Sequence, residues 1–379
     1  MGIRTVSKKS ILIMIHCAEH TGYAIASLEH VFLTAAKRAG FSDDEIFWSY
    51  KTTTTKNNSH IIECDYLDRA SHSQLATLIT NNNIATVLAF DLGFPSAVIG
   101  TLKKAGVKHI ISYWGASMSS INSGFKLLLK KLECLLTTNK PDTFIFESEA
   151  MRNTATHGRG IRESATDIIY LGVDTHKFSP NYDRDNYAHS IFNIPENRKI
   201  VFYSGHMEER KGVRVITQAA IHLVDELDFK DVHFVICGNK NNEADTYEKL
   251  LHNKKARDHV TFAGYRLDIP ELMRGSYVGV IASTGWDSFT MSSIEMMASG
   301  LPLIVSNLQG LCETIEPDKN GFLISPGDYG ALAENIKKLI KNTTLANQFS
   351  IASRARAEQL FSIETQINKF TELLNKAGN

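Results

Sequence analysis

The sequence lacks several features that would assign it to a specialised class of protein. Its 41 lysines and arginines balance 41 aspartates and glutamates, so no net charge favours a nucleic acid partner. The longest apolar runs, such as ILIMI at 11–15, are far shorter than the ~20 residues that a membrane-spanning helix needs. No small-residue cleavage site follows the first of them, so we expect no secretion signal.

The cysteines lack any pattern that would pair them. Five are present, Cys17, Cys64, Cys134, Cys237 and Cys312, and they are scattered without a CxxC spacing. An odd number of scattered cysteines favours reduced thiols over a disulfide framework or a zinc site. We therefore expect a cytoplasmic protein.

Short β-type runs alternate with helical segments along the whole chain. At 379 residues and 43% apolar content, about two domains are expected. Continuous apolar strands with helices between them predict parallel sheets that are covered on both faces. The predicted strands are 11–15, 45–50, 85–90, 108–113, 143–148 and 167–171 in the first half, and 199–205, 232–238, 259–264, 277–283, 302–307 and 321–325 in the second.

The alternation is interrupted once, at a polar stretch with two prolines between residues 172 and 198. We interpret this stretch as a domain linker. The predicted organisation is a first domain at 1–172, a linker at 173–198, a second domain at 199–360 and a closing amphipathic helix at 361–379. Two doubly wound, Rossmann-like α/β domains facing a cleft follow from it, with ligands beyond the carboxyl ends of the strands.

The stretch WDSFTMSSIEMMASGLPLIVSN, residues 286–307, carries two carboxylates eight positions apart, Asp287 and Glu295. Asp287 comes after the apolar run 277–283 and is expected in the loop at a strand's carboxyl end. The following segment predicts a helix that ends at Gly300 and whose N-terminus can bind an anion. Glu295, one turn inside, can accept hydrogen bonds from vicinal hydroxyls. The alternative is that Asp287 caps the helix and Glu295 is a solvated charge.

A second stretch, KIVFYSGHMEERKGV, places a polar loop after Gly205 and then Lys211 and Gly212 at a helix start. A lysine beside a helix N-terminus suits a diphosphate, because both contribute positive potential. The spacing is not the GxxxxGK[ST] of a P-loop. Taken alone, Lys211 and His206 can equally be solvated charges.

The order of these motifs resembles the retaining nucleotide-sugar glycosyltransferases of family 4, which have the GT-B fold. The resemblance covers most of residues 165–370. The family's first loop usually runs Gly-Arg-Leu-x-x-x-Lys-Gly, and here it is GHMEERKG. Its paired-acid motif usually begins Glu-x-Phe-Gly, and here DSFTMSSIE has Asp287 for the first Glu, keeps Phe289 and has Thr290 for Gly. SGLPLIVSNLQGLCETI and NGFLISPGD are also similar to family segments.

The resemblance implies an acceptor-binding first domain, a donor-binding second domain, and a final helix that crosses back to the first domain. It implies that Lys211 and His206 hold the donor diphosphate and that Glu295 holds the ribose hydroxyls. Asp287 and the backbone of Ser288–Met291 would hold the sugar, and the loop from Gly264 to Arg266 would line the base. The implied donor-binding residues are Gly205, Lys211, Arg266, Ser288, Phe289, Thr290, Met291 and Glu295, and the implied catalytic residues are Lys211, His206 and Asp287.

The implied reaction is transfer of a hexosyl or N-acetylhexosaminyl unit from a UDP- or GDP-sugar, with retention. The acceptor would be a hydroxyl of a glycan, a lipid-linked glycan or a small molecule, in bacterial surface polysaccharide or glycoconjugate synthesis. Cationic groups on the diphosphate stabilise the leaving group without a metal, and no Asp-x-Asp motif follows a predicted strand, so no metal or other cofactor is expected. Two alternatives stay open: a nucleotide-sugar epimerase or hydrolase of the same fold, and a non-catalytic partner subunit.

His206 is a departure from the family pattern, which has Arg at this position. Arginine is always charged, whereas imidazole titrates near neutrality. We therefore expect transfer to weaken above neutral pH.

The first half holds fewer signals. His16 and His20 are four apart, but a strand end and a loop are expected there rather than a helix that would bring both to one zinc ion. The same loop has no GxGxxG motif, which argues against a dinucleotide-binding enzyme. The resemblance makes Gly22 and Tyr23, in the loop after the first strand, candidates for the acceptor site. Trp114 stands where many relatives have a His near the reacting sugar, and it can stack on a sugar or fill core space. Asp91, after the strand 85–90, is either an acceptor contact or a structural cap.

The segment 124–140, GFKLLLKKLECLLTTNK, combines Lys126, Lys130 and Lys131 with a leucine-rich face. Such a helix can lie on an anionic membrane surface. More often, an amphipathic helix of this kind lies on the protein surface with its apolar face in the core. Peripheral contact with the inner face of the membrane is therefore one expectation, and a buried leucine face is the other.

Overall fold

The computed structural model describes residues 9–55, 58–180, 186–238 and 242–378. The chain divides into two compact units, each of which is described by itself. The first unit comprises residues up to Tyr170 together with Glu364 onward, and the second comprises Leu171–Ile363. Among the described residues, no helix combines the length and apolar character that crossing a bilayer requires.

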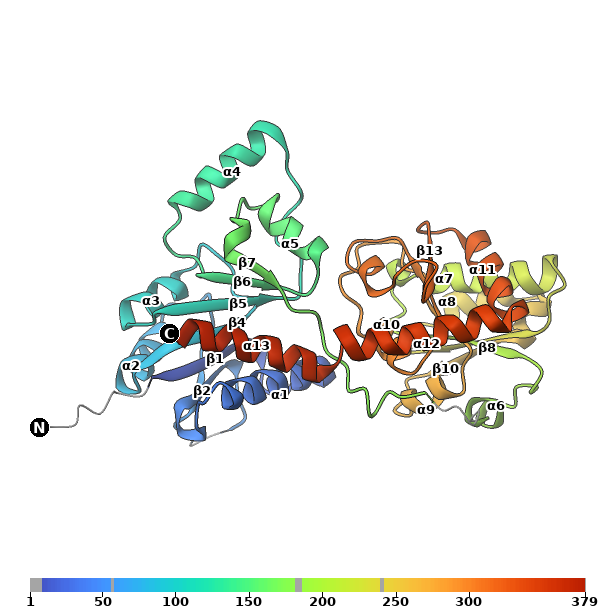
Figure 1. Cartoon of the computed structure of the whole chain (residues 1–379), viewed down its shortest axis with the longest axis horizontal. Helices are drawn as coiled ribbons and strands as arrows, with labels where there is room; N and C mark the ends of the chain where they lie inside the picture. The colour runs from blue at the N-terminus through green and yellow to red at the C-terminus, as the bar shows by residue number, and fades with distance from the viewer. Residues whose placement is uncertain (1–8, 56–57, 181–185, 239–241, 379) are drawn as a thin grey trace, which may run out of the picture. The chain divides into compact units, whose positions relative to one another are not determined.

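The first unit is built on a seven-stranded parallel sheet with the order β3-β2-β1-β4-β5-β6-β7 (Figure 1). Every residue of β1 from Ser10 to Ile15 is buried, because helices cover the sheet on both faces. The strands are β1 Ser10–Ala18, β2 Ile46–Thr52, β3 Ile61–Glu63, β4 Ile84–Phe90, β5 His109–Trp114, β6 Thr143–Phe146 and β7 Thr166–Ile168.

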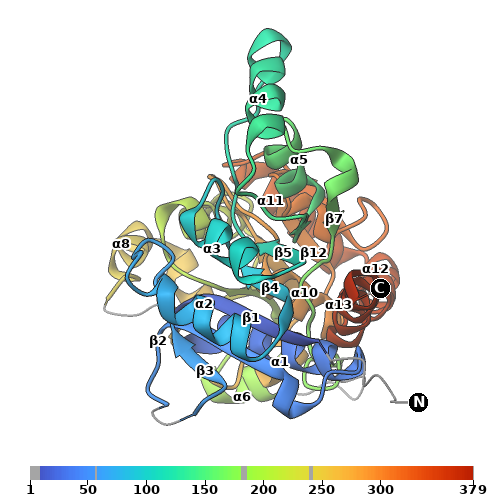
Figure 2. The same cartoon turned by 90° about the vertical axis from the view of Figure 1, so that its left-hand side faces the viewer.

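The final helix of the chain packs on this first unit. Phe370 is fully buried, with its ring 5.0 Å from that of Phe32 and 5.2 Å from that of Tyr113. Arg38 pairs with Glu364 at the start of the same helix. Figure 2 shows this helix beside α1. The helices of the unit are α1 Gly22–Arg38, α2 His72–Asn81, α3 Ala97–Ala105, α4 Gly124–Leu136, α5 Glu149–Thr156 and α13 Ile363–Gly378.

The second unit repeats the plan with a six-stranded parallel sheet of order β10-β9-β8-β11-β12-β13. Its strands are β8 Lys199–Ser204, β9 Val232–Cys237, β10 Val260–Gly264, β11 Val278–Ile281, β12 Leu303–Ser306 and β13 Gly321–Ile324. Its helices are α6 Tyr187–Phe192, α7 Val213–Ile221, α8 Asp245–Glu248, α9 Ile269–Arg274, α10 Met291–Ala298, α11 Tyr329–Lys341 and α12 Thr343–Leu360.

The α/β class and the doubly wound sheets are as predicted, and each of the twelve predicted strands is present. β3 was not predicted, because three residues at a sheet edge are too short to give a period. Leu171 onward belongs to the second unit, and α6 lies within the stretch 173–198, where the sequence showed no helical period. Residues 181–185 of that stretch lie outside the described residues.

Candidate functional site

The strand order of the second sheet defines one place where a ligand can bind. The order reverses between β8 and β11, so the loops that follow these two strands run in opposite directions across the sheet's carboxyl edge. In doubly wound sheets this reversal opens a crevice that takes the ligand. The loop after β8 carries His206 and Lys211, and the loop after β11 carries Asp287.

The two loops are joined by their backbones. The N–H of Thr284 donates to the carbonyl oxygen of Arg210 at 2.8 Å, and the Arg210 guanidinium donates to the carbonyl oxygen of Trp286 at 2.9 Å. Gly212 has a φ of +76°, and a Cβ there would lie 1.7 Å from the carbonyl oxygen of Ala282. Only glycine fits this position, which explains why Lys211 is followed by Gly in the motif.

Lys211 and Asp287 form an ion pair at the centre of the site. The Lys211 Nζ lies 2.9 Å from Asp287 Oδ1, and the two side chains are 16% and 5% exposed. The Ser283 hydroxyl donates to Asp287 Oδ2 at 2.6 Å, and the Asp287 N–H donates to Gln309 at 3.3 Å. Because both carboxylate oxygens are engaged, Asp287 acts in this structure as the group that positions the Lys211 ammonium.

Glu295 lies in α10 and is buried, with 8% of its surface exposed. Among the described residues its carboxyl group accepts no hydrogen bond, although buried polar groups almost always find a partner. Burial raises its pKa to about 7, and the charge of Lys177 opposes that rise. A buried carboxyl without a donor is suited to a ligand that brings hydroxyl groups.

The N-terminus of α10 carries a second polar group without a hydrogen-bond partner in the described structure. Thr290 is the N-cap residue, but its side chain makes no capping hydrogen bond. Its Oγ1 is buried and has no hydrogen-bond partner in the described structure. The free N–H groups of the first turn carry the positive end of the helix dipole. Ser288 and Met291 are half-buried on either side of this turn.

Phe289 is a core residue rather than a ligand contact. It is 3% exposed and its ring packs edge-on against Phe361 at 5.1 Å. Its place in the motif is therefore explained by packing that fixes the loop between Asp287 and α10, and a ligand could meet only its backbone.

The loop that carries His206 is fixed by two buried tyrosines. The Tyr203 hydroxyl donates to the carbonyl oxygen of His206 at 2.6 Å, and the Tyr247 hydroxyl donates to that of Met207 at 2.7 Å. The His206 side chain is exposed and belongs to the same loop as Lys211. Gly205 lies under this loop, with its carbonyl oxygen 2.1 Å from where a Cβ on Gly238 would be.

Arg266, expected beside a nucleotide base, is engaged elsewhere. Its Nε donates to Asp268 at 2.8 Å, and the Tyr187 hydroxyl donates to the same carboxylate at 2.6 Å. Its guanidinium also lies 5.6 Å from the ring of Phe192. Arg266 thus ties the loop after β10 to α6, while Tyr265 beside it is 61% exposed.

In the first unit, the corresponding reversal lies between β1 and β4. Gly22 opens α1 with a φ of +72°, and Tyr23 is 54% exposed in the first turn. Asp91, after β4, has a φ of +50° and accepts a hydrogen bond from the Gly115 N–H at 3.0 Å. Asp91 therefore bridges the ends of β4 and β5, as a structural cap would.

Trp114 packs against the apolar cluster that contains Cys134, Phe144 and Met151. This contact accounts for the ring by core packing, although its buried Nε1 donor has no partner in the described structure.

Sequence reasoning missed Glu147, which is 6% exposed at the end of β6. Its Oε1 lies 2.9 Å from where a Cβ on Gly115 would be, so Asp91 and Glu147 meet the same glycine. Burial, and then the charge of Asp91, raise the pKa of Glu147 well above its ordinary range. Burial also raises the pKa of Asp91 to about 6. The sequence signal was weak, because Glu147 precedes a helix start as an ordinary acidic cap residue would.

Ser283 and Arg210 were also missed, although both shape the site by holding Asp287 and the loop after β11. A small residue at a strand end and a charged residue next to the motif lysine carry no distinctive spacing. No group of three or more His, Cys, Asp or Glu side chains within the described ranges is placed to hold a metal ion.

Part of the chain is similar to known proteins. Residues 186–356 match the model of the family described as "Glycosyl transferases group 1". Spore coat protein SA from Bacillus subtilis is 33% identical over 213 residues, covering 52% of this chain and 55% of that protein. The UDP-Gal:alpha-D-GlcNAc-diphosphoundecaprenol alpha-1,3-galactosyltransferase from Escherichia coli is 25% identical over 206 residues, covering 54% and 53%. The chain spans about half the length of the curated relatives it matches.

A solved structure is similar to nearly the whole chain. HepE from Anabaena, in complex with UDP, aligns with a TM-score of 0.74 at 19% identity, covering 97% of this chain and 100% of that one. Together with the two doubly wound sheets, this likeness confirms the GT-B fold expected from the sequence.

Glu295 gives the site a signature in the pH dependence of stability. The unfolded chain loses this proton near the ordinary pKa of 4.5, whereas the folded chain holds it to about 7, so ionisation favours unfolding as pH rises between these values. At pH 8 the cost is roughly 3 kcal/mol. We expect Glu295→Gln to raise the free energy of unfolding of the second unit at pH 8 more than at pH 5, as measured by denaturant titration at both pH values. An equal effect at both would contradict the unpaired, buried carboxyl, and Glu334→Gln, on the surface of α11, is the control.

Proposed function

Since residues 186–356 belong to the glycosyl transferases of group 1, we propose that this chain is a retaining family 4 enzyme. It moves a hexosyl or N-acetylhexosaminyl unit from a UDP- or GDP-sugar to an acceptor hydroxyl. The observation that carries the proposal is the arrangement at the β8–β11 reversal. There Lys211, which is paired with Asp287, the uncapped N-terminus of α10 and the buried carboxyl group of Glu295 lie in the same unit.

Each group in this arrangement matches a part of a nucleotide-sugar. Lys211, with His206 in the same loop, meets the diphosphate, because the ammonium presents donors and positive charge and the imidazole can add a further donor. Glu295 accepts hydrogen bonds from the ribose hydroxyls, which relieves its unpaired burial. The backbone of Ser288–Met291 faces the sugar, with Asp287 holding Lys211 behind it. UDP is the nucleotide we favour, because HepE, of the same fold, was solved with it.

The same groups account for catalysis. In transfer, the bond from the anomeric carbon to the diphosphate breaks, and the electron pair leaves with the nucleotide. The acceptor oxygen forms the new bond on the face that the diphosphate leaves, and its hydroxyl proton passes to the departing phosphate. Lys211 and the α10 N-terminus stabilise the charge that grows on the diphosphate, so this chemistry needs no metal.

The acceptor we propose is a lipid-linked glycan in bacterial surface polysaccharide or glycoconjugate synthesis. One relative is, by its name, a galactosyltransferase that acts on a diphosphoundecaprenol. A lipid-linked acceptor places the enzyme in the cytoplasm at the inner face of the membrane, with residues 124–140 as the contact. The first unit, with the β1–β4 reversal and Tyr23, is the side that receives the acceptor.

Nucleotide binding tests the proposal directly. UDP, GDP, ADP and dTDP are each added to the wild type, to Lys211→Ala and to Glu295→Ala, and the melting temperature is recorded. A ligand that binds only the folded state raises that temperature by mass action. We expect UDP to stabilise the wild type, and each variant to lose at least about tenfold in affinity, or roughly 1.4 kcal/mol. Lys337→Ala, on the surface of α11, should respond as the wild type does.

No stabilisation by any nucleotide would contradict the proposal and favour a non-catalytic partner subunit. Stabilisation by UDP with hydrolysis or epimerisation of UDP-sugar, and no transfer to any acceptor, would favour the second alternative.

The His206 position predicts a pH effect on binding. Histidine is the residue type whose charge ordinarily changes near neutral pH, whereas arginine stays charged. UDP affinity should fall severalfold between pH 6 and pH 8.5 in the wild type and stay nearly constant in His206→Arg. Calorimetric titration at both pH values measures it. Parallel pH profiles in the two proteins would contradict a role for His206 at the diphosphate.

A further inference from the structure

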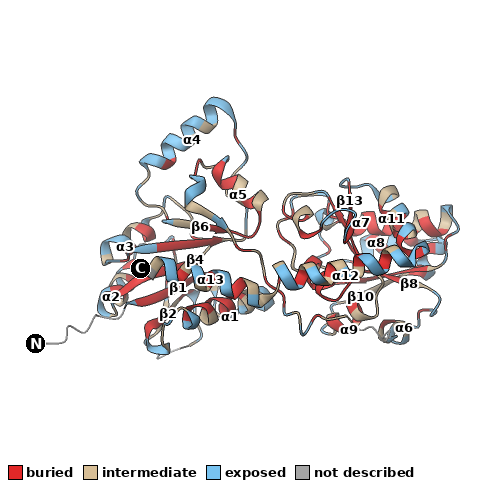
Figure 3. Ribbon diagram, in the orientation of Figure 1, coloured by how far each residue is buried: buried red, intermediate tan, exposed pale blue. Residues whose placement is uncertain are grey.

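The apolar side chains of α4 are exposed to solvent. Phe125, Leu128, Leu129, Leu132, Leu135 and Leu136 are between 49% and 73% exposed, and Ile121, just before the helix, is 66% exposed. Within α4 only Cys134 is buried. The expectation that this leucine-rich face lies in the core is therefore wrong. In Figure 3 the helix is coloured as exposed along nearly its whole length.

The contacts of α4 explain which side faces out. Cys134 joins a cluster with Phe144, Phe146 and Met151, and the backbone at Lys130–Lys131 lies against Gly160, where a Cβ would be 2.4 Å away. At about 100° per residue, Phe125, Leu129, Leu132 and Leu136 fall on the side opposite Cys134. The helix is thus attached by the side that carries Cys134, and its broad apolar side faces away from that attachment.

An exposed apolar side of this size is energetically unfavourable in water. Burying one leucine or phenylalanine fully stabilises a protein by about 1.5–3 kcal/mol. In α4, five such side chains are more than half exposed and a sixth, Leu129, is 49% exposed. Contiguous apolar patches on soluble proteins mark interaction sites. Seven of the sixteen large apolar side chains that are exposed among the described residues lie between 121 and 136, so the patch is concentrated in one element.

The positive charge around α4 favours an anionic partner. Residues 121–140 contain four lysines and one glutamate, a net charge of +3 in a chain whose overall charge is zero. Glu133 pairs with Lys130 at 2.7 Å, whereas Lys126 and Lys131 form no ion pair with any described residue. Two copies of this surface would repel each other, so self-association is disfavoured. An anionic bilayer offers both an apolar interior and negative charge at its surface.

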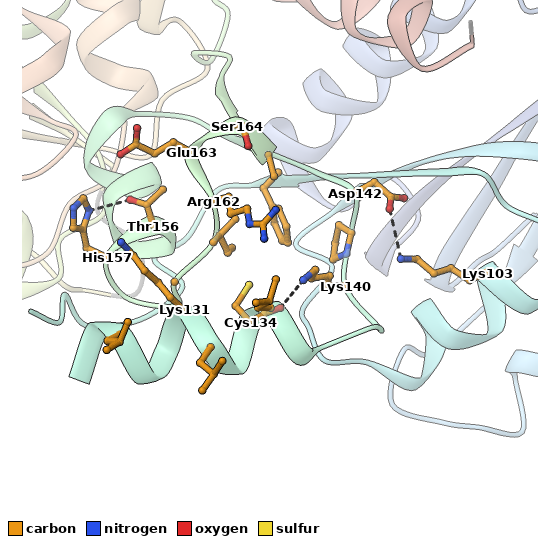
Figure 4. Close-up of a pocket in the computed structure, with 18 residues that line it drawn as sticks. Lys103, Lys131, Cys134, Lys140, Asp142, Thr156, His157, Arg162, Glu163 and Ser164 are labelled. Atoms are coloured by element: carbon orange, nitrogen blue, oxygen red, sulfur yellow. Dashed lines mark hydrogen bonds and ion pairs between the residues drawn. The ribbon is translucent and has the colours of Figure 1, made fainter. Parts of the chain in front are cut away.

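A groove behind α4 adds a place for a phosphate. A pocket of about 810 Å³ lies between α4 and residues 156–165. Leu128 and Leu135 give it an apolar wall. Lys131 and Arg162 line it and form no ion pair with any described residue, and Asp142 and Glu163 also line it. Figure 4 shows the Arg162 side chain extending into the space between the helix and the segment opposite.

We propose that α4 is an in-plane anchor for anionic phospholipid bilayers, with Phe125, Leu129, Leu132 and Leu136 in the acyl region. Lys126, Lys131 and Arg162 then meet lipid phosphates at the level of the headgroups. The anchor brings the first unit to the surface where a lipid-linked acceptor is found. That benefit rests on the proposed function, whereas lipid binding itself does not.

Vesicle flotation of the full chain tests this anchor. The wild type, Leu129→Ser/Leu132→Ser and Lys126→Glu/Lys131→Glu are mixed with phosphatidylcholine vesicles, with or without phosphatidylglycerol. We expect the wild type to float with the anionic vesicles. The serine pair should lower the partition constant at least about tenfold. The glutamate pair should lower it by a similar factor on anionic vesicles only, and added salt should mimic it.

Matched controls separate the anchor from general effects. Leu67→Ser/Ile351→Ser removes two other exposed apolar side chains, and Lys104→Glu/Lys376→Glu reverses two other exposed charges. Both should float as the wild type does. All substituted positions are exposed, so the melting temperatures should stay within about a degree or two of the wild type.

Three outcomes would overturn the proposal. They are a wild type that stays in solution with both vesicle types, equal loss in the α4 and control variants, and a dimer in sedimentation that the serine pair dissolves. Stabilisation by UDP is measured on the same proteins. Because it should be unchanged in the α4 variants, failure of the anchor and failure of the donor site are distinguishable.

Discussion

The ion pair between Lys211 and Asp287 is the interaction on which the candidate donor site depends. Taking a lysine and an aspartate out of water is costly unless they are paired and their remaining hydrogen-bonding groups also find partners. The structure meets both conditions, since Ser283 supplies the second hydrogen bond to the carboxylate and the backbones of Arg210 and Thr284 join the two loops. The pair therefore places an ammonium where the sheet order reverses.

The same constraint explains the residues around it. Gly212 is required because the chain passes under Ala282 with no space for a side chain. Phe289 is buried against Phe361 because the loop between Asp287 and α10 must hold its shape for the helix N-terminus to face the crevice. Among the described residues nothing donates a hydrogen bond to Glu295, and the Thr290 hydroxyl also has no partner there, so both groups of the site are incomplete. This incompleteness is what a ligand with vicinal hydroxyls corrects.

Sequence patterns predicted the architecture well, because buried parallel strands are continuous apolar runs that need no tertiary information. They also located Lys211, Asp287 and Glu295, since strand ends and a helix start fix where those residues fall. The sequence patterns could not predict which other side chains each residue contacts. Arg266 is adjacent to Asp268 and α6, and its guanidinium is bound there. Trp114 packs into a cluster whose other members lie far along the chain.

The helix α4 shows the same limit. A period of 3.6 residues reveals that an apolar stripe exists, and it does not say which side meets the sheet. Here α5 and Ile161 already fill the core cluster, so α4 attaches through Cys134 and its leucines remain outside. The first unit thus has an exposed apolar helix, and the second unit has the candidate nucleotide site.

The most direct test of the central claim is hydrogen exchange of the backbone with and without UDP, followed by mass spectrometry. The account predicts slower exchange in the loop after β8, at 205–212, and from Asp287 through the first turns of α10. Both changes should be absent in Lys211→Ala. Protection confined to the loop after β1 in the first unit, or to segments of the second unit away from the β8–β11 reversal, would contradict it.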